Sequence, residues 1–206
     1  MGEITWGCDM FGNPLLETVL TQHQERAVQA VDRYWHQLAA GRGVAKRSAI
    51  DPSVIQDALE YAFVGERLSE GHARVRVAGG ALIAVADMEV AGMPLAVMIA
   101  PKDRAKFTDR VAHVFDDPAI VTLGLTGDVK FGQPPLSAQL RLYPLTDDQG
   151  RVTRMMGTFV TVGRIGSSPR RFTIEDAQTE PVRETAPQAS RPGISRGHLR
   201  LVVSNA

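Results

Sequence analysis

Residues 136–163 read LSAQLRLYPLTDDQGRVTRMMGTFVTVG, and this stretch decides the fold. Apolar side chains alternate with polar ones at its start, at Leu136, Ala138, Leu140 and Leu142. Successive side chains of a strand point to opposite faces, so this alternation predicts a strand with one buried face. The loop Asp147–Gly150 then ends in a glycine, which is typical of a hairpin turn. The stretch therefore predicts two antiparallel strands, 136–145 and 151–163.

The residues before this hairpin predict the rest of a sheet and its helices. Strand signals occur around Tyr61–Val64, at Arg74–Val77 and over 119–126, with a turn at Glu70-Gly71 between the first two. Residues 79–100 are apolar but interrupted by glycine, which indicates several short helical turns, and Pro101 opens a longer helix to about Phe115. Two strands, a helical middle and three strands predict an α+β fold, a five-stranded antiparallel sheet with helices over one face.

An amphipathic helix is expected ahead of the sheet, over residues 22–40. Its apolar residues recur at steps of three and four: Ala27, Val31, Tyr34, Trp35 and Leu38. This stripe needs a surface to cover it, either the free sheet face of its own chain or the same helix of a second chain. We expect the second arrangement, a homodimer with these five residues at its interface. Asp51-Pro52 then begins a short helix.

The two ends of the chain are expected to lie outside the domain. Residues 1–21 are a lead-in with a short helix starting at Asn13-Pro14, and the domain itself spans 22–163. Residues 164–206 are rich in Pro, Ser, Arg and Glu, so we expect them to be mostly disordered. Within this tail, 199–203 is a small apolar alternation that could dock on a sheet edge.

Composition excludes several classes of function. The chain has 206 residues and a formal net charge of zero, so bulk charge draws it neither to nucleic acid nor to anionic lipid. Cys8 is its only cysteine, which excludes an internal disulfide and fits a reducing cytoplasm. We see no signal peptide and no apolar run long enough to cross a membrane. These features predict a cytoplasmic protein.

Short motifs along the chain resemble a bacterial family of stand-alone single-PAS-domain proteins. They are Arg33-Tyr34-Trp35, Ile50-Asp51-Pro52 with Ile55, Val90-Ala91-Gly92-Met93-Pro94-Leu95, the run Tyr143–Val152, and Met156-Gly157-Thr158-Phe159-Val160. The resemblance covers about residues 22–163 and implies a sensory or protein-interaction domain. It implies no catalytic residues. Because few residues remain for an output domain, we expect the signal to pass through a partner protein.

The candidate residues for chemistry support no particular reaction or cofactor. The five histidines are dispersed without metal-ligand spacing, and His113 would be a haem ligand only if it faced a cavity. Residues 79–100 contain no cysteine, so covalent flavin photochemistry is not expected. Arg42, Lys46 and Arg47 form a small basic loop, for which a phosphate partner is the less favoured alternative. The cofactor stays unknown at this point.

Three functions remain open on the sequence alone. The favoured one is a non-catalytic sensory or adaptor module that binds a signalling partner, a small apolar ligand, or both. The expected ligand pocket is lined by Met88, Met98, Phe107, Val111, Leu123, Leu140 and Met156. A small-molecule enzyme on a cone-like α+β fold would need a carboxylate or histidine pointing into the cavity, and Asp87 and Glu89 are the only acids of the middle segment. The third alternative is a ligand-free interaction protein with a filled core.

Overall fold

The computed structural model describes residues 20–40, 43–128 and 131–182. The α-helices are α1 (Gln22–Ala39), α2 (Gly80–Ala86) and α3 (Arg104–Phe115), and the 3-10 helices are η1 (Arg47–Ala49), η2 (Pro52–Ala58), η3 (Leu95–Met98) and η4 (Pro101–Asp103). The strands are β1 (Ala45–Lys46), β2 (Ala62–Ser69), β3 (His72–Ala78), β4 (Ala119–Gly127), β5 (Leu136–Thr146), β6 (Val152–Gly163) and β7 (Phe172–Pro181). The expected strands, the short helical turns and the longer helix are all confirmed.

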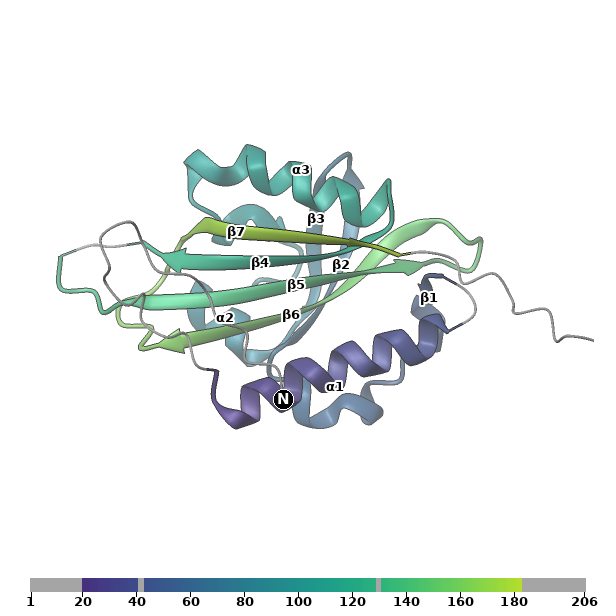
Figure 1. Cartoon of the computed structure of the whole chain (residues 1–206). Helices are drawn as coiled ribbons and strands as arrows, with labels where there is room; N and C mark the ends of the chain where they lie inside the picture. The colour runs from purple at the N-terminus through teal and green to yellow at the C-terminus, as the bar shows by residue number, and fades with distance from the viewer. Residues whose placement is uncertain (1–19, 41–42, 129–130, 183–206) are drawn as a thin grey trace, which may run out of the picture.

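One twisted sheet holds these strands in the order β3-β2-β6-β5-β4-β7 (Figure 1). Each neighbouring pair in this path is antiparallel, while the two-residue β1 joins β5 in parallel. The predicted hairpin is at the centre, with Leu140 of β5 directly opposite Phe159 of β6. The five expected strands are therefore present, and β1 and β7 are additional.

The inner face of the sheet packs against α2, η3 and α3 in a core of fully buried side chains. Leu136, Ala138, Leu140 and Leu142 all lie on this face and are at most 4% exposed, as the alternation predicts. Phe107 and Val111 of α3 pack against the same cluster. Burial of this apolar surface is the main force holding the helices to the sheet.

The outer face of the sheet is covered by α1 and η2, which lie on the side opposite α3 (Figure 1). Thr21 begins α1 with a capping box, since its hydroxyl accepts from the Gln24 amide and the Gln24 side chain accepts from the Thr21 amide. The apolar stripe of α1 packs on Ile120, Tyr143, Leu145 and Met156 of its own chain.

This packing corrects the expected dimer interface. Ala27, Val31, Tyr34 and Trp35 are at most 7% exposed within one chain, and Leu38 is partly buried in the same cluster. The stripe therefore folds back on the free sheet face, which is the other of the two arrangements open to it. Four of the five side chains are thus covered within one chain, so the structure does not support a homodimer interface on this stripe, and homodimerisation stays a prediction.

Strand β7 corrects the expected tail. Residues 164–197 were expected to be disordered, yet Phe172–Pro181 pair with the whole of β4, from Ala119 to Gly127. Phe172 is 0% exposed and Ile174 is 6% exposed, both in the inner core. The expectation of disorder is wrong for this segment, and the sheet extends past Gly163.

Buried and helical contacts hold β7 at its start. The Arg170 side chain is 2% exposed, and its Nε donates to Asp128 Oδ1 at 3.0 Å. The Ile174 amide donates to the Asp103 carboxylate at 3.0 Å, and Lys106 Nζ donates to the Ile174 carbonyl at 3.2 Å. The outward-facing backbone groups of Ile174 in this edge strand are therefore satisfied by Asp103 of η4 and Lys106 of α3.

Some expectations fall outside the described residues. They are the short helix at Asn13-Pro14, the environment of Cys8, and docking of residues 199–203. Among the helices that the structure describes, none combines the length and the apolar character needed to cross a bilayer.

Candidate functional site

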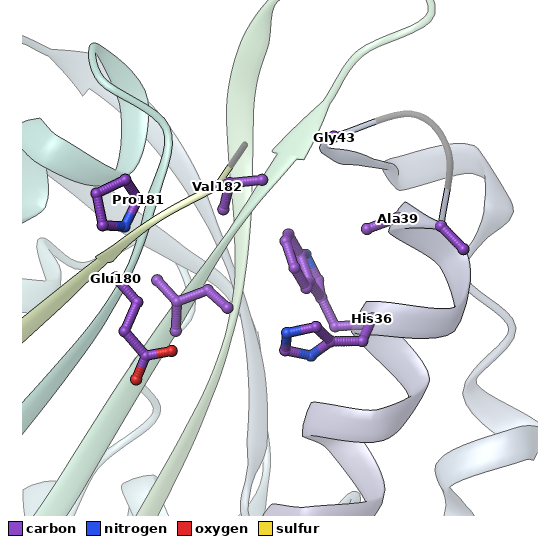
Figure 2. A pocket seen from close by; sticks show the side chains of 9 residues that line it. His36, Ala39, Gly43, Glu180, Pro181 and Val182 are labelled. Atoms are coloured by element: carbon purple, nitrogen blue, oxygen red, sulfur yellow. The ribbon is translucent and has the colours of Figure 1, made fainter. Parts of the chain in front are cut away.

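A hollow of about 230 Å³ opens between the C-terminal end of α1 and the end of β7 (Figure 2). Its wall combines helix, strand and loop residues: Trp35, His36, Ala39, Ala40, Gly43, Ile120, Glu180, Pro181 and Val182. In Figure 2 the His36 ring and the Glu180 carboxylate lie on opposite sides of the opening. The site thus has an apolar floor and a polar rim.

Trp35 is the largest side chain of the floor, and it is held rigidly. It is 2% exposed, and its indole Nε1 donates to the Pro144 carbonyl at 2.8 Å. Its ring lies against that of Tyr143, with the ring centroids 5.8 Å apart. A buried indole with its N–H satisfied forms a fixed, wide apolar surface. The floor is therefore preformed.

A network of charged and polar groups borders the hollow. Asp32 of α1 accepts from Arg141 at 3.0 Å and from the Tyr143 hydroxyl at 3.3 Å. Arg141 also lies 3.9 Å from the Glu180 carboxylate, so it links α1 to β7 through β5. His36 Nδ1 lies 2.9 Å from the Asp32 carbonyl, to which it donates when it carries the proton. These contacts set the distance between α1 and β7.

Burial gives Tyr143 a fixed protonation state. The side chain is 0% exposed, and burial raises the pKa of the phenol far above its usual value of 10.0. Arg141 acts in the opposite direction, while the charges of Asp32 and Glu180 raise the pKa further. Tyr143 therefore stays a neutral hydrogen-bond donor to Asp32 near neutral pH.

A second hollow, of about 580 Å³, lies at the other end of the sheet. It is lined by loop residues at Ala100, Pro101, Asp128, Gln133, Ser167, Ser168, Pro169 and Arg171. The hollow beside α1 is the candidate site, because the buried Trp35 gives it a fixed apolar floor.

The structure does not bring the seven expected pocket residues together. Five of them pack in the inner core and are at most 5% exposed: Met98, Phe107, Val111, Leu123 and Leu140. Met88 is 43% exposed at the surface, and Met156 lies on the outer face beneath α1. None of the seven lines either hollow. Met88 and Met156 were wrongly placed in one pocket with the other five.

The candidate groups for haem binding or catalysis lie at the surface. His113 is exposed on α3, and Asp87 and Glu89 are exposed after α2, so none of the three is buried in the inner core. Within residues 20–40, 43–128 and 131–182, no three His, Cys, Asp or Glu side chains are placed to hold a metal ion. The placement of these groups gives the enzyme alternative no support.

Sequence reasoning missed most of the residues that form the hollow. Trp35 was identified, but as a dimer contact, and Ile120 was recognised only as part of a strand. Glu180, Pro181 and Val182 were assigned to a disordered tail. The local signal in this segment is the alternation of Phe172 and Ile174, which is too short to predict a strand by itself.

The comparison with family profiles agrees with this architecture. The sequence profile described as "PAS domain" matches residues 23–160. No curated protein matches the chain in sequence. A solved structure from work described as "Flavin Analogue Sheds Light on Light-Oxygen-Voltage Domain Mechanism" is 18% identical, with a TM-score of 0.42. That match covers 53% of this chain and 82% of the other chain.

Proposed function

Because the chain belongs to the PAS domain family, a family of sensory modules, we propose that it is a non-catalytic adaptor in bacterial signal transduction. In this proposal the module acts by binding a partner protein. The binding site is the hollow between α1 and β7, and its occupant is an apolar side chain of the partner.

The observation that carries this proposal is the filling of the inner core. The space between α3 and the sheet is occupied by Phe107, Val111, Leu123 and Leu140, each at most 2% exposed in one packed cluster. A small ligand there would have to displace several of these side chains, each at a cost of about 2–5 kcal/mol in lost packing. The preformed hollow at the surface requires no such rearrangement.

The size and chemistry of the hollow favour an anchoring side chain. Pockets for drug-sized ligands have volumes of about 300–1,000 Å³, and this one is about 230 Å³. Protein interfaces commonly place one apolar or aromatic anchor in such a pocket, surrounded by polar contacts. Trp35 and Ile120 would contact the anchor, and His36 and Glu180 would contact polar groups around it.

The test blocks the hollow at an exposed position. Ala40 lines the hollow and is exposed, so Ala40→Trp fills the opening without disturbing the core. Ala105→Trp, at an exposed position of α3, is the matched control. A partner identified by co-purification from the native host is then produced separately and titrated. We expect stoichiometric binding to the intact chain and to Ala105→Trp, and loss of binding with Ala40→Trp.

Two results would overturn the proposal. One is a partner that binds the folded Ala40→Trp variant as tightly as the intact chain. The other is a small molecule that native mass spectrometry finds on the purified intact chain and that Ala40→Trp does not displace, because this would place the sensory function in a different site.

A further inference from the structure

A compact group of charges lies on the outer face of β2, β3 and β6, on strands that contribute no residue to the hollow. Glu66 of β2 is directly opposite Arg74 of β3 on one side and Arg154 of β6 on the other. These three residues form one transverse row across three strands. The row ends at the sheet edge, since β3 is the outermost strand.

One carboxylate in this group is shared by three arginines. Arg74 donates from Nε and NH2 to Glu66 Oε2 at 2.9 and 2.8 Å. Arg154 NH1 lies 2.7 Å from Glu66 Oε1, and Arg76 NH2 also contacts Oε2. Three positive charges against one negative charge leave a net charge of +2. The carboxylate cannot satisfy all the guanidinium N–H donors, since each arginine has five.

A β-bulge helps to place the third arginine. The pairing between β2 and β3 shifts between Val64 and Gly65, which are opposite Val77 and Val75, so Arg76 is the extra residue. Bulges bend a strand locally and re-aim a side chain. Here the Arg76 guanidinium reaches the same carboxylate as that of Arg74.

The exposure of these side chains shows which charge faces the solvent. The side chains of Arg74, Arg76 and Arg154 are 34%, 45% and 34% exposed, whereas that of Glu66 is 13% exposed. The carboxylate therefore lies beneath the guanidinium groups, and the surface presents positive charge. Val77 of the same strand pair is 63% exposed and Leu68 of β2 is 49% exposed, so apolar side chains accompany the charges.

We propose that this arginine cluster binds an acidic segment of a partner protein. Planar guanidinium groups pair with carboxylates through two parallel hydrogen bonds, and three of them at one place can hold successive Asp or Glu side chains. Val77 and Leu68 would contact the aliphatic parts of that segment. This surface is separate from the hollow and rests on the proposed adaptor function only in that both bind a partner.

An octaglutamate peptide with a fluorescent label is the probe, and fluorescence anisotropy measures its binding. We expect the intact chain to bind it with an affinity that falls as salt is added, because exposed charges are screened. Arg76→Ala and Arg154→Ala should each weaken binding by about two- to fivefold, the range for exposed ion pairs. Lys102→Ala, an exposed cation on the α3 side, is the control and should change nothing.

Glu66→Gln should change the peptide affinity in the direction opposite to the arginine variants, and it separates an effect on binding from an effect on stability. This change removes the negative charge and raises the net charge of the cluster from +2 to +3, so the peptide should bind more tightly. A purely structural role for the cluster would leave peptide binding unchanged or weaken it. Thermal unfolding of each variant confirms that folded protein is compared. Arg76→Lys should retain only part of the binding, because the charge is kept while the two parallel hydrogen bonds of the guanidinium group are lost.

Three outcomes would overturn the proposal. The first is equal peptide affinity of the intact chain and Arg76→Ala, and the second is no gain in peptide affinity with Glu66→Gln. The third is displacement of the peptide by inorganic phosphate at equal concentration, which would show an adventitious anion site only. Ala40→Trp should bind octaglutamate like the intact chain. The failure of this inference is thereby distinguished from the failure of the proposed site at the hollow.

Discussion

At the scale of the residue, two neighbouring glycines show how differently adjacent positions are packed. A Cβ on Gly79 would lie 2.1 Å from the Leu59 carbonyl oxygen and 2.3 Å from that of Glu60, which are backbone atoms. A Cβ on Gly80 would have its nearest neighbour at 3.9 Å, in the flexible Glu60 side chain. The Gly79 amide also bonds to Ala62 at 2.8 Å, so the backbone cannot easily move away.

We therefore predict opposite effects for Gly79→Ala and Gly80→Ala. The first should lower the free energy of unfolding by about 1–3 kcal/mol or more through overpacking. The second should leave it unchanged or raise it by up to about 1 kcal/mol, because alanine is the better helix former. Urea denaturation of both variants provides the measurement. Equal effects would mean that the Leu59–Glu60 backbone is not packed against Gly79 as described.

Core burial gives a second prediction, at Leu140. The side chain is 0% exposed at the centre of the inner core, so Leu140→Ala should destabilise the protein by about 2–5 kcal/mol. Leu68→Ala, at a side chain that is 49% exposed, is the matched control and should cost less than about 0.5 kcal/mol. Chemical denaturation compares the two, and a similar loss for both would contradict the assigned faces.

The lowered pKa of Glu66 predicts that part of the protein's stability is lost in acid. Burial raises the pKa of Glu66, but the hydrogen bond from Arg74 and the charges of Arg154, Arg76 and Arg74 outweigh it, so the pKa lies below its usual 4.5. A carboxyl with a lowered folded-state pKa stabilises the fold above its unfolded pKa, and this stabilisation is lost as pH falls through the folded value. Glu66→Gln should therefore lose less stability than the intact chain below pH 4.5. Denaturation curves at pH 7 and at several acidic pH values test this, and parallel losses would refute it.

Single methionines show a limit of sequence reasoning at this scale. The sequence predicts that Met155 and Met156 face opposite sides of β6, and the structure confirms that they do. Strand alternation shows that two adjacent side chains diverge, but it does not show which side faces α3. Met155, rather than Met156, belongs to the inner core, where it is 0% exposed.

At the scale of the element, β7 carries a prediction about where the chain can be shortened. A chain that ends after Gly163 lacks Phe172 and Ile174 and leaves one edge of β4 unpaired along its length, while the other edge stays paired with β5. Loss of one such side chain costs about 2–5 kcal/mol, and whole domains are stable by only about 5–15 kcal/mol. We expect the chain ending after Gly163 to lose its cooperative unfolding transition, and a chain ending after Val182 to keep it.

Circular dichroism during thermal unfolding distinguishes these two truncated chains. Cooperative unfolding of the chain that ends after Gly163 would show that β7 is dispensable. A Phe172→Ala variant in the full chain adds a graded measurement, with an expected loss of about 3–5 kcal/mol.

The helices and strands differ in how clearly the local sequence pattern predicts them. Strands β5 and β6 were predictable because four alternating apolar residues and a polar loop ending in glycine occur together. Strand β7 was not, because Phe172 and Ile174 are its only large apolar residues and the surrounding composition is typical of disorder. Its pairing depends on β4 and on Arg170 with Asp128, which are distant contacts that local composition does not reveal.

At the scale of the whole molecule, the sheet is a single layer between two groups of helices. The α3 side was expected, while the α1 side was assigned to a second chain. Amphipathicity shows that the α1 stripe must be covered, but it does not distinguish a face in the same chain from one in another. That is why the hollow between α1 and β7 could not be located from the sequence.

Trp35→Glu tests this arrangement. Because the indole is buried against its own sheet, the change should destabilise the fold by about 3–5 kcal/mol or more. This is the cost expected for losing a buried aromatic side chain. Gln37→Glu, at an exposed position of the same helix, is the control. A homodimer through some other surface remains a prediction, which light scattering on the intact chain tests. One result would support the α1 stripe as a homodimer interface after all. The intact chain would be dimeric, and Trp35→Glu would be monomeric with unchanged stability.

The contacts that hold the two outermost strands have a consequence for how copies of the protein behave together. Asp103 and Lys106 bond to one end of β7, and on the other edge the Val75 amide donates to the Met93 carbonyl at 2.9 Å. Open strand edges act as templates for aggregation, and proteins avoid this by covering them or by placing charge and proline there. The rest of β7 carries Asp176, Glu180 and Pro181. These features make both outer strands poor templates for the edge-to-edge pairing through which fibrils grow.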